Sequence, residues 1–215
     1  MLVRAARDGS WLVELNSETL PRVLVNRTYF TKVSVTTKDT DEREYLTDCL
    51  QNANWLVKSL AQRARTILRV AEEIIRQQDG FLTHGVQYLR PMNLKTVAEA
   101  ISMHESTVSR VTSNKYMATS RGIFELKYFF TSSISSSEDG EAHSSESVRY
   151  RIKQLIDAEC AAAVLSDDNI VDMLKGDGID IARRTVAKYR EAMRIPLSVQ
   201  RRREKRMSEQ MERTA

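Results

Sequence analysis

The chain of 215 residues has few of the residues that break helices or staple small folds: seven glycines, three prolines and two cysteines. Scarce Gly and Pro favour an all-helical fold, because both interrupt helices. Cys49 and Cys160 lie too far apart for a zinc motif and suggest no disulfide framework, which indicates a reducing cytoplasm. No hydrophobic run approaches the ~18 residues that a membrane helix needs.

Catalytic and metal-binding patterns are also missing. The three histidines, His84, His104 and His143, are scattered, and no pair of acids has the spacing of a metal site. An enzyme that acts on DNA needs such carboxylates, or a nucleophile beside its base. We therefore expect no enzyme, no metal and no cofactor. His104 is interpreted as a helix-end residue or a neighbour of phosphate.

Positive charge is present but unevenly distributed. Residues 182–206 contain ten Lys or Arg against two acids, in a chain whose net charge is only +4. Such a block is typical of a protein that binds a polyanion. RNA is an alternative from charge alone, although no aromatic platform accompanies the block. The cations at 201–206 either add phosphate affinity or form a solvated end.

Apolar residues recur every three or four positions from residue 41 to residue 78, and no Gly or Pro interrupts them. This spacing predicts one helix of about 57 Å at 1.5 Å per residue. Asp39, Thr40 or Asp41 can cap its start. Such a helix is a core element, a coiled coil or a bridge between modules.

Three shorter segments complete the outline. Residues 11–35 alternate weakly, which predicts a short β-hairpin around a turn at 16–21. Residues 123–130, IFELKYFF, are interpreted as a helix that closes a core. Residues 131–147 hold eight serines in 17 positions, which is typical of a linker between two modules. The abrupt start of the sequence indicates a piece of a longer protein.

Residues 94–113 have the spacing of two short helices across a tight turn, a helix-turn-helix. Ser102 falls in the turn, where a left-handed conformation would cost serine about 1 kcal/mol. Val108 and Val111 face inward. The second helix then exposes polar side chains that can reach base edges, namely Glu105, Ser106, Thr107, Ser109 and Arg110.

A second unit of the same form is predicted near the end of the chain. Residues 165–168, LSDD, begin one short helix, KGDGID at 175–180 ends it, and ARRTVAKYRE at 182–191 forms the next. This last helix places cations beside a narrow apolar stripe, and arginine can fork onto guanine while lysine suits phosphate. Residues 107–110 and 185–188 match in residue class. The cations are Arg183, Arg184, Lys188 and Arg190.

ARRTVAKYRE resembles the signature box of the sigma-54 (RpoN) family of bacterial RNA polymerase sigma factors. Segments at 13–26, 52–63, 103–117 and 121–130 are similar to that family in the same order. The resemblance implies a C-terminal fragment with five parts: a remnant of the polymerase core-binding domain (1–40), a long helix (41–78), a helix-turn-helix domain (79–130), the serine linker (131–147) and the RpoN-box domain (148–215).

The resemblance also implies how promoter DNA would be recognised. The box helix would read the GG of the upstream (−24) element through Arg183 and Arg184, with Lys188 and Arg190 on the DNA backbone. The helix-turn-helix would lie over the downstream (−12) element, where Glu105 matches a position that the family uses. Arg110 matches another such position. Ser102 departs from the family, which usually has glycine in this turn.

The implied partners are double-stranded promoter DNA, the β and β′ subunits of the RNA polymerase core and, in a full-length protein, an AAA+ activator ATPase. The implied location is the bacterial cytoplasm, at the nucleoid. The family's glutamine-rich N-terminal region is not in this sequence, so we expect the chain to bind promoter DNA without supporting activated transcription. The alternative is a helix-turn-helix repressor that dimerises through the long helix.

Overall fold

The computed structural model describes residues 1–16, 18–37, 39–134 and 143–214. Its helices and single 3₁₀ turns are α1 (Arg27–Thr36), α2 (Thr40–Gln77), α3 (Asp79–His84), η1 (Val86–Tyr88), α4 (Leu94–Ala100), α5 (Glu105–Thr112), η2 (Leu126–Phe129), α6 (Ser145–Asp157), α7 (Asp167–Gly176), α8 (Arg183–Ala192) and α9 (Ser198–Thr214). Its strands are β1 (Leu2–Ala5), β2 (Trp11–Glu14), β3 (Tyr116–Thr119), β4 (Gly122–Glu125), β5 (Ser133–Ile134) and β6 (His143–Ser144).

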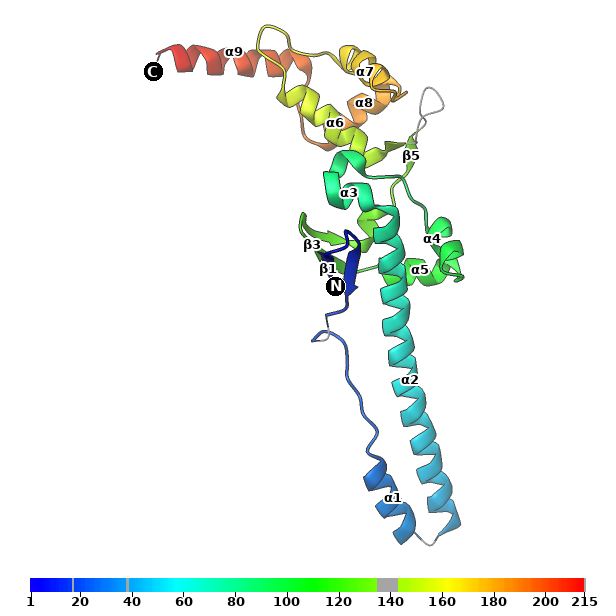
Figure 1. Ribbon diagram of the computed structural model, residues 1–215. Coiled ribbons are helices and arrows are strands. Elements are labelled where there is room, and N and C mark those ends of the chain that lie inside the picture. The colour runs from blue at the N-terminus through cyan, green and yellow to red at the C-terminus, as the bar shows by residue number, and fades with distance from the viewer. Residues whose placement is uncertain (17, 38, 135–142, 215) are drawn as a thin grey trace.

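Two separate hydrophobic cores divide these elements into two modules (Figure 1). The N-terminal module combines the second half of α2, α3 to α5 and a four-stranded sheet of order β2-β1-β3-β4. The C-terminal module consists of α6 to α9. Over the described part of the chain, no helix has the length and apolar character that crossing a membrane requires.

Helix α2 is the predicted long helix. Asp39 caps it, with its carboxylate accepting a hydrogen bond from the backbone N–H of Asp41 at 3.2 Å. The second half of α2 is buried in the N-terminal module, where Val70, Ala71 and Ile74 are fully enclosed. The first half extends away from both modules with α1 alongside it (Figure 1). The helix is therefore a core element at one end and an arm at the other.

A β-hairpin forms near the N-terminus, but its turn is not where the sequence predicts it. Strand β2 pairs with β1 across a tight turn at Asp8 and Gly9, where Gly9 has φ +84°. Residues 27–36, which belong to the region of weak alternation, form helix α1 instead. Strand β1 also pairs in parallel with β3, matching Leu2 to Ala118. Residues 1–14 thus belong to the same module as the helix-turn-helix, although the sequence assigns them to another segment.

The aromatic segment at 123–130 closes the core as expected, but mostly without a helix. Residues 122–125 form strand β4, and only 126–129 make a 3₁₀ turn. The ring of Phe81 meets Phe124 and Phe129 edge to face, at centroid distances of 5.2 and 5.3 Å. Pairing of Met117 with Phe124 across β3 and β4 supplies backbone bonds that outweigh the helical pattern of these residues.

The predicted helix-turn-helix is present as α4 and α5. Ser102 adopts the left-handed conformation, with φ +54°, although this conformation costs serine about 1 kcal/mol. His104 is a helix-end residue, since its imidazole accepts from the N–H of Ser106 at 3.2 Å and caps α5; a place beside phosphate stays a prediction. Val108 is fully buried and Val111 half-buried. The turn and the buried Val108 therefore fix the orientation of α5, so that its polar side lies on the outside of the module.

The two described ends of the serine segment hold the modules together. Ser133 pairs with Ser144 in the small β5–β6 sheet, and the N–H of Ser145 donates to the carbonyl of Ser132 at 3.2 Å. Ser144 also caps α6 by accepting from the N–H of Ser147 at 3.0 Å. Helix α6 packs against η1. The rest of the predicted linker, residues 135–142, lies outside the described residues.

Candidate nucleic-acid interface

Helices α7 and α8 form the second predicted helix-turn-helix. Ser166 caps α7 by accepting from the N–H of Asn169 at 3.1 Å. Gly178 then takes φ +82°, which reverses the chain, and the N–H of Ile179 bonds back to the carbonyl of Leu174 at 2.9 Å. Val186 is fully buried. The apolar face of α8 is thereby seated on the core of the C-terminal module.

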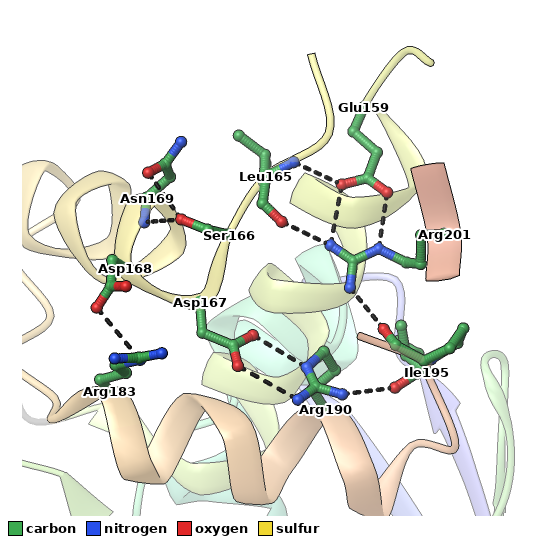
Figure 2. A network of polar contacts seen from close by, with 11 residues as sticks. Glu159, Leu165, Ser166, Asp167, Asp168, Asn169, Arg183, Arg190, Ile195 and Arg201 are labelled. Carbon is green, nitrogen blue, oxygen red and sulfur yellow. Dashed lines mark hydrogen bonds and ion pairs between the residues drawn. The ribbon is translucent and has the colours of Figure 1, made fainter. Parts of the chain in front are cut away.

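The opposite face of α8 carries three of the four predicted cations. Arg184 and Lys188 lie one turn apart, and both are exposed. Neither forms an ion pair with any residue that the structure describes. Arg183 is the first residue of α8 and also exposed; its Nε lies 3.3 Å from Oδ1 of Asp168 (Figure 2). The charges of Arg184 and Lys188 are therefore available to an anion approaching this face, whereas Arg183 lies beside an acid.

Arg190 is the fourth predicted cation, and the structure corrects its position. Its side chain is only 2 % exposed. Nε and Nη2 donate to the two carboxylate oxygens of Asp167 at 2.9 and 3.2 Å, and Nη1 donates to the carbonyl of Ile195 at 2.9 Å (Figure 2). This fork ties α8 to the first turn of α7. We therefore leave Arg190 out of the proposed DNA contacts.

A second buried arginine anchors α9. Nε and Nη2 of Arg201 donate to the carboxylate of Glu159 at 2.8 and 3.1 Å. The same guanidinium donates to the carbonyls of Pro196 and Leu165, at 2.7 and 2.8 Å. Nζ of Lys205, one turn later, lies 3.5 Å from Oε1 of Glu159 and donates to the backbone carbonyl of Glu159 at 2.5 Å. The Glu159 side chain is fully buried, so these cations stabilise a carboxylate that water cannot reach.

The basic cluster at 201–206 thus has two sides. Arg201 and Lys205 face inward and hold the module together, whereas Arg202, Arg203 and Arg206 are exposed. Neither sequence interpretation, phosphate affinity or a solvated end, applies to the inward pair. One signal for the pair is visible in the sequence, because Glu159, two residues beyond the end of α6, keeps the spacing of the apolar stripe and a buried acid requires a cation.

The environment of Glu159 predicts an acid-sensitive C-terminal module. Burial alone would raise the pKa of Glu159, but hydrogen bonds from Arg201 and Leu165 and the charges of Arg201 and Lys205 outweigh it and lower the pKa. The resulting stability is complete above the unfolded pKa of about 4.3 and is lost as pH falls through the lower folded pKa. Urea unfolding followed by circular dichroism measures the free energy of unfolding. The difference in this free energy between the native protein and Glu159→Gln should become smaller as pH falls below about 4.3.

The outward face of α5 carries most of the predicted side chains as expected, but not all five. Glu105, Ser109 and Arg110 are exposed, while Thr107 is half-buried. Ser106 is exposed as well, but its hydroxyl lies 2.8 Å from the Nδ1 of His104 and is shared with the helix cap. Three of the five predicted side chains therefore project freely, and two are partly engaged by the protein.

A groove between α2 and α5 was not predicted from the sequence. The groove has a volume of about 680 Å³ and runs beside α5, with Thr107 and Val111 in its wall. Every charged residue in its wall is a cation from α2, and the exposed Trp55 lies among them. These cations are Lys58, Arg63 and Arg65. The spacing of these cations along α2 could have indicated that they form a cluster. It could not have indicated that the cluster lies against α5.

Comparison with known proteins identifies relatives along nearly the whole chain. Residues 43–203 match the family model described as "Sigma-54, DNA binding domain". The chain is 70 % identical over 203 residues to RNA polymerase sigma-54 factor 2 of Bradyrhizobium diazoefficiens, covering 94 % of this chain and 38 % of that protein. It is 67 % identical over 204 residues to the RNA polymerase sigma-54 factor of Caulobacter vibrioides, covering 94 % and 41 %. The chain thus spans about 40 % of the length of these relatives.

A solved structure is similar as well. The crystal structure of Aquifex aeolicus sigmaN bound to promoter DNA matches 88 % of this chain and 55 % of that chain, with 30 % sequence identity and a TM-score of 0.58. None of these relatives is described as a repressor, so the comparisons do not support the alternative of a dimeric helix-turn-helix repressor.

Proposed function

The chain belongs to the sigma-54 family of RNA polymerase sigma factors, and on this premise we propose that it recognises promoter DNA through two helix-turn-helix units. The observation that carries the proposal is the outward face of α8. Arg183, Arg184 and Lys188 lie together there at the start of a recognition helix, whose N-terminal residues reach base edges in this class of motif. The arginines would read the GG of the −24 element, and Lys188 would contact phosphate.

Helix α5 is proposed to lie over the −12 element. Its exposed Glu105, Ser109 and Arg110 provide an acceptor, a hydroxyl and a guanidinium, which suit cytosine, several bases and guanine respectively. Thr107 and Ser106 would contribute further contacts through their shorter side chains. The cations of the groove beside α5 support this placement, because they would attract the phosphates that flank the element.

RNA polymerase core is the second proposed partner, through the arm formed by α1 and the first half of α2. Large apolar side chains are exposed along and just before this arm: Leu24 is 95 % exposed, Val35 78 % and Tyr45 69 %. Exposed apolar clusters mark interaction surfaces. The β and β′ subunits are the proposed contacts, with the AAA+ activator acting on the longer protein. The proposed location is the bacterial nucleoid.

Changing the GG of the −24 element should weaken binding of the chain to a promoter duplex roughly 10-fold or more, because arginine forks to guanine are lost. In Arg184→Ala, the preference for the GG duplex should fall to the part that the remaining fork of Arg183 supplies. Fluorescence anisotropy with both duplexes at one salt concentration measures this.

Lys188→Ala is the matched control on the same helix face. It removes one proposed phosphate contact, so it should weaken binding to both duplexes by the same factor and leave the preference for GG intact. An Arg184→Ala protein that keeps the native affinity and the native preference would contradict the proposed readout.

A further inference from the structure

Asp168 contacts the first arginine of the proposed reading helix. Its Oδ1 lies 3.3 Å from Nε of Arg183 (Figure 2). The two side chains come from different helices of the second helix-turn-helix, α7 and α8. The structure describes no other ion pair or hydrogen bond of the Arg183 side chain. This contact therefore bears on how the guanidinium is presented to DNA.

The backbone that carries the Asp168 carboxylate is fixed. Asp168 is the second residue of α7, just after the Ser166 cap, and Ile170 of the same turn is fully buried in the core. Arg183 is the first residue of α8, where the backbone is equally fixed by the N–H of Val186, which donates to the carbonyl of Ala182 at 3.2 Å. Both partners thus project from rigid helix starts.

The geometry also leaves the reading edge of the arginine free. A guanidinium has five N–H donors in a planar fork. Asp168 engages Nε, so the terminal edge made of Nη1 and Nη2 remains available for the O6 and N7 of guanine. A long side chain that is already oriented loses less rotational freedom when it binds.

We propose that Asp168 is a positioning residue that orients Arg183 toward guanine and so sharpens the base preference of the chain. The proposal rests on the proposed function, because it requires that Arg183 reads a base. It assigns to an exposed acid a role in specificity, while the acid itself does not bind DNA.

Simple electrostatics predicts a different effect for the same residue. An acid beside a DNA-binding face repels phosphate, so its removal should strengthen binding to every duplex by the same factor. Loss of positioning should instead reduce the ratio between the affinities for the GG duplex and the changed duplex. The ratio therefore separates the two roles.

The test is Asp168→Asn in the full chain, titrated with the GG duplex and with the changed duplex at one salt concentration. We expect the affinity ratio to fall roughly 3- to 10-fold, a part of the discrimination that one arginine fork supplies. Asp172→Asn is the matched control, since Asp172 is an exposed acid one turn along α7 with no ion pair among the described residues. It should leave the ratio unchanged.

Two further measurements make the result decisive. In an Arg183→Ala background, Asp168→Asn should no longer change the ratio, because the residue acts through the arginine. The thermal midpoint should stay at its native value, since the pair is exposed on both sides (68 % and 60 %).

An unchanged ratio in Asp168→Asn overturns the role of Asp168, while native preference for GG leaves the proposed function standing. A native chain without any preference for GG overturns the proposed function and this proposal together.

Discussion

Arg190→Ala is expected to destabilise the C-terminal module by about 3–5 kcal/mol, the usual effect of breaking a buried ion pair. The substitution removes both hydrogen bonds of the Asp167 carboxylate, whose side chain is only 14 % exposed, and the donor to the carbonyl of Ile195. The free energy of unfolding can be measured by urea denaturation, with amide hydrogen exchange assigning the loss to α7 and α8.

Arg184→Ala is the control on the same helix. Arg184 is exposed and has no ion pair among the described residues, so its loss should change stability by less than about 0.5 kcal/mol. The two variants should therefore separate an effect on the stability of the module from an effect on base recognition. If Arg190→Ala kept its stability and instead lowered the salt dependence of DNA binding, the buried fork would be refuted and the backbone contact restored.

Arg201→Ala is expected to cost about 3 kcal/mol and to release α9 from the module. The Glu159 carboxylate would keep only Lys205 at 3.5 Å and the N–H of Leu165 at 3.0 Å. Exchange protection should disappear from α9 first, while α8 keeps most of its protection, since Arg190 still ties it to α7. Hydrogen exchange with mass spectrometry on the full chain measures both helices in one experiment.

Arg202→Ala tests whether α9 is held on the module by the contact that Arg201 makes or only by positive charge. It removes the same charge from the adjacent residue of α9, but Arg202 is exposed. Native-like protection of α9 is expected in this variant. Equal loss of protection in Arg201→Ala and Arg202→Ala would mean that general charge, and not the contact with Glu159, holds the helix.

The features predicted best from sequence are those fixed by local spacing. Helix α2 differs from its predicted bounds by one residue at each end, because an uninterrupted apolar repeat and an acidic cap determine it. The turn at Ser102 was predicted for the same reason, since two apolar repeats leave only a few residues to reverse the chain. Both helix-turn-helix units, and hence the faces of α5 and α8, follow from such patterns.

The site residues were harder to assign. The exposure of an arginine depends on whether an acid pairs with it, as well as on its position on the helix. Arg190 and Arg184 lie on the same helix with the same side chain. Val186 is fully buried, and Arg190 follows it by one turn, so Arg190 shares the buried face. Its partner, Asp167, lies 23 positions earlier. The spacing to Val186 was visible in the sequence, but the distant acid that makes burial favourable was not.

Strand pairing was the least predictable feature, because a strand does not specify its partner locally. Strand β2 was recognised as part of a hairpin, yet its partner precedes it instead of following it. Strand β3 pairs on both sides, with β4 and with β1, and the second pairing depends on contacts across most of the N-terminal module. Local alternation cannot distinguish these arrangements.

The parallel contact of β1 with β3 also has a consequence for synthesis on the ribosome. The amino group of Met1 donates to the carbonyl of Tyr116, so the partners are 115 positions apart. At the usual ~5–20 residues per second, the first hairpin is made about 6 to 23 s before the strand that completes its sheet. During that interval Val3 and Val13, which are buried in the finished molecule, lack the β3 side of their core. Strands β1 and β2 thus reach their final environment only after β3 has been synthesised.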